Sequence, residues 1–271
     1  LLDANADRKT AVIAVGGGVI GDLAGFVAAT YTRGLRFVQV PTSLLAQVDS
    51  SVGGKVAINL PGAKNIVGAF WQPAAVVLDT RALLSLPQRE YQAGLGEVVK
   101  YGVIRDLQFF EFLEQHVDRI LARDDEALRY IVRRCCQLKA EVVHEDEREE
   151  SGRRAILNYG HTFGHALEAA TRYTQLLHGE AVSIGMVCAS RLAELLGLVD
   201  ASLTTRQKEL LAAFSLPVDV PSVDLDVVLD AMQRDKKVAH GDLRFVLPTR
   251  LGHVELRQKI DSELVRAAIE R

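Results

Sequence analysis

Three of the seven histidines in this 271-residue chain, His161, His165 and His178, fall within one short stretch. If residues 158–168 are helical, His161 and His165 are four residues apart on one helix face, and Glu168 lies one turn further on. Imidazole nitrogens backed by a carboxylate are donors that zinc prefers, and a catalytic zinc site keeps one coordination position open. The residues alone therefore favour a metal site, and the simpler alternative is a histidine that caps or packs a core helix.

A glycine-rich turn provides the second candidate site. The three glycines at 16–18 follow the apolar run 10–15, which is typical of a strand covered on both faces, and precede the small-residue stretch 23–31. A strand, a glycine turn and a helix start in this order form a phosphate cradle, because backbone N–H groups and the helix dipole favour an anion there. The turn lacks the GxGxxG pattern of an ordinary Rossmann fingerprint, and tight packing is the alternative explanation for its glycines.

Two further stretches are expected to be loops that carry a lysine. Residues 49–55 place Lys55 directly after paired glycines, and residues 62–65 place Lys64 in a second glycine-containing segment. Both lysines suit contact with phosphate or a nucleotide, and a solvated loop lysine is the alternative for each. In the segment 94–102, Glu97 and Lys100 share a helix face among apolar neighbours, where a buried carboxylate needs a metal or another partner.

The elements that must position these residues divide the chain into two parts. Strands at 10–15, 36–40 and 74–78 alternate with helical segments, which predicts a parallel sheet with ligands at the carboxyl ends of its strands. After Pro87 the pattern becomes helical, and a domain boundary is expected there, between residues 1–87 and 88–271. The expected helices of the second part cover residues 89–104, 107–116, 125–144, 155–172 and 180–196, and a hairpin is expected at 242–247 and 253–256.

Composition excludes several classes of protein. The net charge is −3 and the basic residues are scattered, which argues against a nucleic-acid surface. No apolar run reaches the roughly 18 residues of a membrane span. The three cysteines show no CxxC spacing, which fits a reducing cytoplasm. The chain begins at Leu1, almost directly before a strand, so a missing beginning is expected.

Six stretches resemble a known family: GGGVIGDLAGFVAATYTRG (16–34), QVPTSLLAQVDSSVGGKVAIN (39–59), GLGEVVKYG (94–102), RAILNYGHTFGHALE (154–168), LHGEAVSIGM (177–186) and DKK (235–237). In this order they resemble the 3-dehydroquinate synthases, lyases of the shikimate pathway to aromatic amino acids. The resemblance implies an incomplete N-terminal Rossmann-like domain that binds NAD, a mainly α-helical metal-binding domain, and an active site in the cleft between them. It also implies further strands and helices before Leu1, including an acid for the adenosine ribose, so this chain is expected to bind NAD more weakly than an extended version.

The resemblance also assigns the site residues. The implied zinc ligands are Glu97, His161 and His178, with Co²⁺ able to replace the zinc, and His165 then faces the substrate. The positions that match the NAD site are Gly17, Gly18, Gly21, Asp22, Thr42, Ser43, Lys55 and Lys64. The positions that match catalytic or substrate contacts are Asp49, Lys55, Lys100, Lys139, Arg154, Asn158, His165, Lys236 and Lys237. Arg33 matches an arginine that reaches the substrate phosphate of a second subunit, which implies a homodimer.

The implied reaction converts 3-deoxy-D-arabino-heptulosonate 7-phosphate to 3-dehydroquinate and phosphate. The nearest alternative is another sugar-phosphate cyclase, of the 2-deoxy-scyllo-inosose or valiolone synthase type, whose substrate lacks the carboxylate that Lys139, Arg154 and Asn158 suit. A glycerol-dehydrogenase-like enzyme and a binding protein without catalysis are more distant alternatives.

Overall fold

The computed structural model describes residues 1–60, 63–238 and 243–270, without the side chains of residues 63–64 and 235–238. The chain forms two compact units. Unit 1 comprises Leu1–Gly94 and Arg123–Glu150, and unit 2 comprises Leu95–Ala122 and Ser151–Arg271. Among the described residues, no helix has the length and the apolar character that a membrane span requires.

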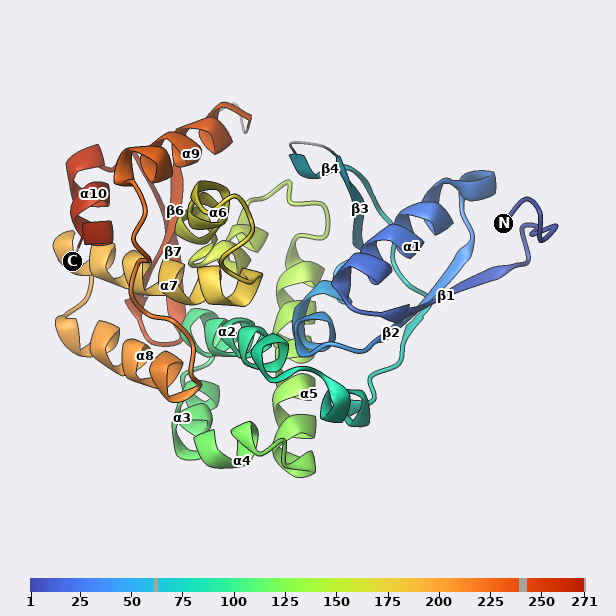
Figure 1. Ribbon diagram of the computed structural model, residues 1–271, viewed down its shortest axis with the longest axis horizontal. Helices are drawn as coiled ribbons and strands as arrows, with labels where there is room; N and C mark the ends of the chain where they lie inside the picture. The colour runs from blue at the N-terminus through green and yellow to red at the C-terminus, as the bar shows by residue number, and fades with distance from the viewer. Residues whose placement is uncertain (61–62, 239–242, 271) are drawn as a thin grey trace. The chain divides into compact units, whose positions relative to one another are not determined.

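Unit 1 is built on a three-stranded parallel sheet in the order β1-β2-β5. The strands are β1 (Ala11–Gly16), β2 (Arg36–Pro41) and β5 (Ala75–Val76), and α1 (Gly18–Thr30) packs against β1 and β2 (Figure 1). The core between helix and sheet contains Ala14, Ala28, Leu35, Phe37 and Val56. The predicted parallel sheet is therefore confirmed, although its third strand is only two residues long.

Between β2 and β5, unit 1 contains a β-hairpin that includes both lysines expected in loops, Lys55 and Lys64. Strands β3 (Lys55–Leu60) and β4 (Ala63–Phe70) pair antiparallel, from Lys55 opposite Phe70 to Leu60 opposite Ala63. The loop interpretation was wrong for Lys55 and for residues 63–65, which belong to these strands. Among the side chains that the structure describes in this hairpin, only that of Val56 is buried in the core, so the hairpin has only a weak alternating pattern in the sequence.

Short helical turns and one long helix complete unit 1. They are η1 (Tyr31–Arg33), the π-helical η2 (Ala46–Ser50), η3 (Thr80–Ser85) and α5 (Asp125–Glu145). The side chain of Ser43 caps the turn before η2, because its Oγ accepts the N–H of Ala46 at 3.3 Å. The boundary expected after residue 87 stays a prediction; α5 lies far beyond it in the sequence and belongs to unit 1.

Unit 2 is mainly helical, as predicted, and contains one hairpin. Helix α2 (Gln88–Arg105) begins in unit 1 and continues into unit 2. The other helical elements of unit 2 are α3 (Leu107–Gln115), α4 (Val117–Leu121), η4 (Arg153–Asn158), α6 (His161–Ala170), α7 (His178–Leu195), α8 (Ala201–Ala213), α9 (Leu225–Val238) and α10 (Ser262–Glu270). The expected hairpin is confirmed as β6 (Arg244–Arg250) paired with β7 (His253–Gln258).

The helix expected over residues 155–172 is interrupted. A 3₁₀ turn, η4, ends at Asn158, and α6 starts only at His161, after Gly160 with φ +79°. A left-handed residue cannot continue an α-helix, and glycine is the residue that adopts this conformation most readily. The break places His161 at the first position of α6, so the start of this helix sets the direction of the His161 side chain.

Candidate active site

Glu97, His161 and His178 converge in unit 2, and their ligand atoms all lie within 4.8 Å of one another. The carboxylate oxygen Oε1 of Glu97 is 3.3 Å from Nε2 of His161 and 3.5 Å from Nε2 of His178. Glu97 comes from the middle of α2, whereas the two histidines are the first residues of α6 and α7. Three helices thus direct one oxygen and two nitrogen atoms to a common point.

These residues fit a divalent metal ion. Glu97 is 0% exposed, and neither of its carboxylate oxygens makes a hydrogen bond of normal geometry to any described residue. The imidazole nitrogens and the ammonium of Lys100 face these oxygens at ion-pair distance only. The ammonium of Lys100 compensates Oε2 of this buried carboxylate, and Oε1, which both imidazoles face, is the oxygen that a further cation would bind. Two imidazoles and one carboxylate are also a common set of three protein ligands for a catalytic zinc.

The charges around this group favour an ionised carboxylate. Burial alone would raise the pKa of Glu97, but the positive charges of Lys100 and His161 hold this pKa well below its usual range. Burial would also lower the pKa of His178, and the carboxylates of Glu168 and Glu97 outweigh that effect and raise it to about 9. The site is therefore organised around negative charge that attracts a cation.

His165 and Glu168 belong to a different group from His161. The rings of His161 and His165 meet edge to face with centroids 5.4 Å apart, but the ligand atoms of His165 cluster with those of Glu168 and His178. His165 is exposed, whereas Glu168 is buried. The first hypothesis from helix spacing, in which His161 and His165 share one metal, therefore does not fit the structure.

The other candidate residues of unit 2 differ in burial. Lys100 and Arg154 are buried, and Lys100 forms an ion pair with Glu97. Asn158 is exposed at the end of η4. Lys236 and Lys237 were also expected in the site, but their side chains lie outside the described part of the chain.

In unit 1, the glycine turn leads directly into α1. Gly17 is the N-cap of α1, and no side chain caps the first turn of this helix. A Cβ atom at Gly17 would lie 3.5 Å from Oγ of Ser43, and one at Gly18 would lie 3.2 Å from Oγ of Ser50. Two serine hydroxyls thus border an uncapped helix N-terminus, which is a favourable arrangement for a phosphate group. Gly21 is confined similarly, because a Cβ there would lie 2.9 Å from Oε1 of Gln39.

Asp22, Asp49 and Lys139 form a charged group in the same unit. The ammonium of Lys139 is 2.7 Å from the backbone oxygen of Asp49 and 3.1 Å from its Oδ1. Burial raises the pKa of Asp22 to about 6, with Lys139 lowering it and Asp49 raising it further. Thr42, which was expected near the nucleotide, donates its backbone N–H to the oxygen of Gly16 and so ties β2 to the glycine turn.

Of the remaining cationic candidates of unit 1, Lys55 and Arg33 are exposed. Lys55 begins β3 and pairs at 2.5 Å with Glu149, which belongs to the charged run 145–150. Lys64 belongs to β4, but its side chain is outside the described set. Arg33 ends η1 in a turn of three successive positive φ angles, 48° at Thr32, 69° at Arg33 and 130° at Gly34. Such a backbone is unfavourable for residues other than glycine.

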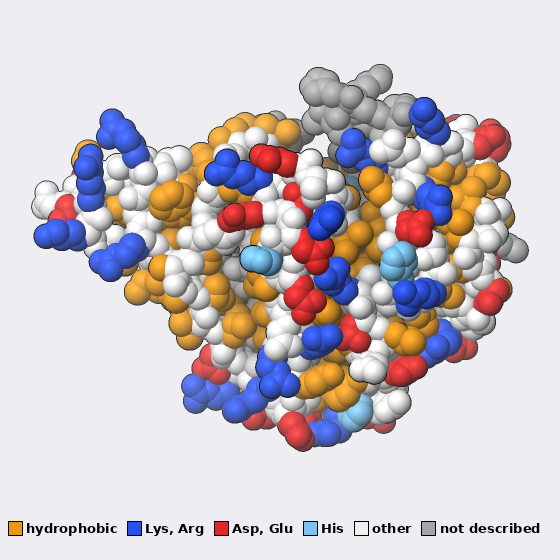
Figure 2. Space-filling view, turned by 180° about the vertical axis from the view of Figure 1, so that it is seen from behind, with side chains coloured by type: hydrophobic (Ala, Val, Ile, Leu, Met, Phe, Trp, Pro, Cys, Tyr) orange, Lys and Arg blue, Asp and Glu red, His pale blue; other side chains and the backbone are white. Residues whose placement is uncertain are grey.

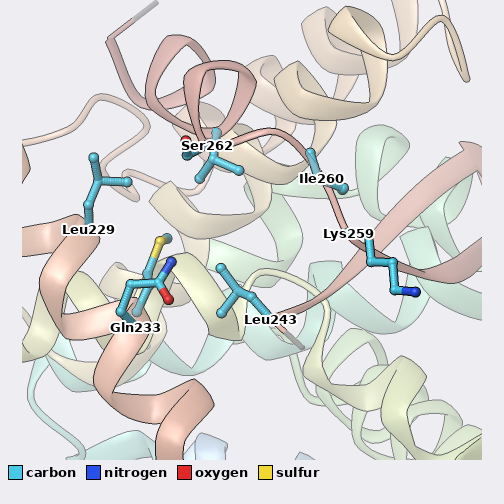
Figure 3. A pocket seen from close by; sticks show the side chains of 8 residues that line it. Leu229, Gln233, Leu243, Lys259, Ile260 and Ser262 are labelled. Carbon is cyan, nitrogen blue, oxygen red and sulfur yellow. The ribbon is translucent and has the colours of Figure 1, made fainter. Parts of the chain in front are cut away.

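Neither the charges on the surface nor a pocket of unit 2 adds a residue to the candidate sites described above. On the face shown in Figure 2, basic and acidic side chains are interspersed. A pocket of unit 2 is bordered by α9, by α10, by Leu243 before β6 and by the segment after β7 (Figure 3). It is lined by Leu229, Met232, Gln233, Leu243, Lys259, Ile260, Ser262 and Val265. None of these is a predicted site residue.

Comparison with known proteins decides the family. Residues 1–93 match the family described as 3-dehydroquinate synthase N-terminal, and residues 94–238 match 3-dehydroquinate synthase C-terminal. A 3-dehydroquinate synthase from Rhodopirellula baltica is 57% identical over 269 residues, which cover 99% of this chain and 72% of that protein. The chain belongs to the 3-dehydroquinate synthase family. The resemblance and the enzyme class expected from the sequence are thereby confirmed.

Two solved structures of related cyclases extend the comparison. A 2-epi-5-epi-valiolone synthase from Streptomyces hygroscopicus, with NAD⁺ and Zn²⁺ bound, is 29% identical with a TM-score of 0.92, and the match covers 99% of this chain and 75% of that one. A 2-deoxy-scyllo-inosose synthase complexed with carbaglucose-6-phosphate, NAD⁺ and Co²⁺ is 32% identical with a TM-score of 0.90, covering 99% and 76%. The 3-dehydroquinate synthase family therefore shares its fold with cyclases that bind NAD⁺ and a divalent metal.

Glu168 was named in the first hypothesis as the carboxylate one turn after His165, and the structure shows which histidine it approaches. Its Oε2 lies near Nδ1 of His178. The contact of Glu149 with Lys55 could not be predicted, because no sequence pattern distinguishes one carboxylate from the others within a charged run.

Proposed function

We propose that this chain converts 3-deoxy-D-arabino-heptulosonate 7-phosphate to 3-dehydroquinate and phosphate, with NAD and Zn²⁺ as bound cofactors. The observation that carries the proposal is the fully buried carboxylate of Glu97, without normal hydrogen bonds and faced by two imidazoles. In a chain of this family, a buried carboxylate that faces two imidazoles is best explained as a set of protein ligands for a catalytic metal ion.

Glu97, His161 and His178 would hold the metal, either Zn²⁺ or Co²⁺ in its place. Bound zinc would act as a Lewis acid that lowers the pKa of substrate hydroxyls. The three protein ligands leave an open position for the substrate. Buried Lys100 keeps Glu97 ionised and so ready to bind the cation.

NAD would be held by unit 1 at the uncapped start of α1. The residues assigned to it are Gly17, Gly18, Gly21, Asp22, Thr42, Ser43, Lys55 and Lys64. The nicotinamide would accept a hydride from the substrate and return it, so NAD is unchanged after each turnover. The glycines allow backbone N–H groups to approach the pyrophosphate, and the serine hydroxyls beside them add hydrogen-bond donors.

The substrate carries a carboxylate and a phosphate, and the cationic candidates suit both groups. Guanidinium and ammonium groups bind such anions through charge-assisted hydrogen bonds. We assign substrate contacts to Asp49, Lys55, Lys100, Lys139, Arg154, Asn158, Lys236 and Lys237. We assign His165 and Asn158 to the relay of hydroxyl protons. The imidazole of His165 can accept and donate a proton near neutral pH, whereas the amide of Asn158 would hold the hydroxyl by hydrogen bonds.

A homodimer completes the proposal, with Arg33 contributed to the neighbouring subunit's site. The exposed side chain of Arg33 is presented by a turn with three positive φ angles, and the ring of Trp71 packs against Gly34 within it. Backbone strain of this kind persists where a defined side-chain direction is useful. The planar guanidinium can donate two hydrogen bonds to a phosphate and stays charged at any working pH.

Another sugar-phosphate cyclase activity is the second candidate, because the valiolone and inosose synthases have the same fold. The identity to 3-dehydroquinate synthase is 57%, against 29% and 32% to those two enzymes. Lys139 and Arg154 also favour a substrate with a carboxylate.

The test is phosphate release from the heptulosonate phosphate, with and without added NAD⁺ and Zn²⁺. We expect 3-dehydroquinate to form only when both cofactors are present. Sedoheptulose 7-phosphate and glucose 6-phosphate, which lack the carboxylate, serve as the comparison substrates. Faster turnover of either one would reject the proposed substrate in favour of the alternative cyclase.

A further inference from the structure

Glu168 is a buried carboxylate that the proposed function leaves without a role. It lies on α6, one turn after His165 and two turns after His161, with 4% of its surface exposed. Its Oε2 atom is 3.4 Å from Nδ1 of His178, at the long end for a hydrogen bond. Burying a carboxylate against an imidazole is costly unless the contact serves a purpose.

The two nitrogens of His178 face two different carboxylates. Nδ1 faces Glu168 at 3.4 Å, whereas Nε2 faces Glu97 at 3.5 Å. An ionised carboxylate only accepts hydrogen bonds, so contact with Glu168 requires the proton on Nδ1. A metal ion that replaces the proton on Nε2 would bind the nitrogen that faces Glu97, while Nδ1 keeps its proton for Glu168.

His161 has the same arrangement with a different acceptor. Its Nδ1 lies 3.1 Å from the backbone oxygen of Tyr159, and its Nε2 lies 3.3 Å from Oε1 of Glu97. A backbone carbonyl is also an acceptor only, so it fixes the same tautomer in His161. Both histidines thus have an acceptor at Nδ1 that leaves Nε2 for the metal, and the two acceptors come from different parts of the chain.

The packing of α6 on α7 fixes the distance between Glu168 and His178. A Cβ atom at Gly185 would lie 2.0 Å from the backbone oxygen of Gly160, and one at Gly164 would lie 3.0 Å from the oxygen of Ala181. Glycine at these positions allows the two helices to approach more closely than side chains would permit. The helix carrying Glu168 is therefore held against the helix that begins at His178.

We propose that Glu168 is a positioning residue, which orients the ring of His178 and fixes its tautomer so that Nε2 binds the metal. The inference rests on the proposed function, because the metal is the one assigned to Glu97, His161 and His178. Outer carboxylates that hold ligand imidazoles commonly raise metal affinity 10- to 100-fold. The competing explanation is that His165, Glu168 and His178 bind a second metal of their own.

The experiment measures Zn²⁺ affinity by competition with a chromophoric chelator, and metal stoichiometry by titration with Co²⁺. We expect Glu168→Leu to bind zinc about 10- to 100-fold more weakly than wild type and to change the visible spectrum of the Co²⁺ form. Glu168→Gln should retain most of the affinity and the wild-type spectrum, because its amide oxygen can accept the same hydrogen bond. One Co²⁺ should bind per chain.

Matched controls distinguish a positioning role of Glu168 from a general loss of folding. Glu114, a partly exposed carboxylate of unit 2 that pairs with Arg206, is replaced in the same way, and Glu114→Leu should keep wild-type zinc affinity. Thermal unfolding of the metal-free variants by circular dichroism checks that each one folds. If Glu168→Leu does not fold, the affinity and spectrum of Glu168→Gln decide, and a spectrum unlike that of wild type overturns the positioning role.

The outcomes distinguish this inference from the proposed function. Wild-type zinc affinity in Glu168→Leu, or a second Co²⁺ per chain that this variant loses, would overturn the positioning role and leave the proposed reaction standing. A wild-type protein that binds no metal would overturn the metal assignment and the positioning role together. Zinc binding that depends on Glu168, in a protein that does not release phosphate from the heptulosonate phosphate, would support the inference and reject the reaction.

Discussion

The metal group of unit 2 and the glycine turn of unit 1 are built on different principles. In unit 2, side chains from three helices meet at one point, and the central carboxylate of Glu97 is fully buried. In unit 1, the candidate cofactor site consists of an uncapped helix N-terminus bordered by half-exposed serine hydroxyls. The first arrangement concentrates its chemistry in a few side chains, whereas the second distributes it over backbone groups.

This difference predicts how each region responds to substitution. Removing a buried side chain that no neighbouring group can replace should have a large effect, because its interaction partners are left unsatisfied. A backbone N–H group cannot be removed by mutation, and exposed charges around it are screened by water. Substitutions in unit 2 should therefore have large effects, and those in unit 1 should have smaller ones.

The largest effect is expected for His161→Ala. It removes one of three proposed metal ligands, so the loss of zinc affinity should exceed the roughly 10- to 100-fold loss expected for an outer residue. Metal content after dialysis and phosphate release should fall together. A variant that keeps full zinc content would show that His161 is not a ligand. It would also contradict the expectation that substitutions in unit 2 have larger effects than those in unit 1.

Lys100→Met tests the buried ion pair with Glu97. In metal-free protein it leaves the buried carboxylate without its ammonium partner, which should lower the free energy of unfolding by about 3–5 kcal/mol. Urea unfolding should be measured in EDTA and again with Zn²⁺. We expect zinc to recover part of the loss, because the cation compensates the same carboxylate. Equal losses in both conditions would indicate that the metal does not contact Glu97.

Arg33→Ala is expected to have an intermediate effect, confined to function. Loss of charge-assisted hydrogen bonds to phosphate should lower kcat/KM about 10- to 100-fold, mainly through KM, and leave zinc content unchanged. Mixing Arg33→Ala with His161→Ala subunits tests the proposed dimer. In a heterodimer, one site combines intact metal ligands with the partner's Arg33, so activity should return. No recovery despite demonstrated subunit exchange would place Arg33 outside the neighbouring site.

The sequence predicted the elements of the metal site better than their geometry. The four-residue spacing of His161 and His165 indicated a shared helix face, and α6 does carry both. Spacing within one helix could not show that His161 joins Glu97, which lies 64 positions earlier on α2. Only the resemblance to the family suggested that pairing, because contacts between distant helices leave no local periodicity.

Two local features also escaped prediction for identifiable reasons. The hairpin of β3 and β4 buries few side chains, so it lacks the alternation that marks a half-buried strand. The start of α6 depends on the left-handed conformation of Gly160, and a glycine within a helical pattern does not by itself show whether the helix breaks. The strands β1 and β2 were predicted correctly because their apolar runs are bounded by glycine and proline.

Asp22→Asn tests a smaller effect in unit 1, with its sign set by pH. Burial raises the pKa of Asp22 from 3.8 to about 6, so its ionisation is less favourable in the folded chain than in the unfolded chain. The penalty is complete above pH 6, declines between pH 6 and 4, and is absent below 3.8. At pH 7.5 the variant should be more stable by about 1 kcal/mol, allowing for solvent screening of this half-buried group.

Urea unfolding at pH 7.5 and at pH 4, with EDTA present, measures this difference between Asp22→Asn and wild type. The control is Asp200→Ala, because Asp200 caps α8 by accepting the N–H of Ser202 at 2.8 Å. Removing that cap should reduce stability at pH 7.5, which is the opposite sign. A stabilisation by Asp22→Asn that is equal at both pH values would show that burial of this carboxylate is not its cause.

The smallest effect is expected for Glu149→Gln, which removes the exposed ion pair with Lys55. The two side chains are 37% and 53% exposed, so water screens their attraction even though the atoms are 2.5 Å apart. The free energy of unfolding should change by no more than about 0.5 kcal/mol, and less in 1 M NaCl. This pair is the exposed counterpart of Glu97 and Lys100, and a loss as large as that of Lys100→Met would contradict the contrast between the two units. A small loss that disappears in high salt would instead show that burial, and not the short distance between charges, makes the carboxylate of unit 2 depend on its partner.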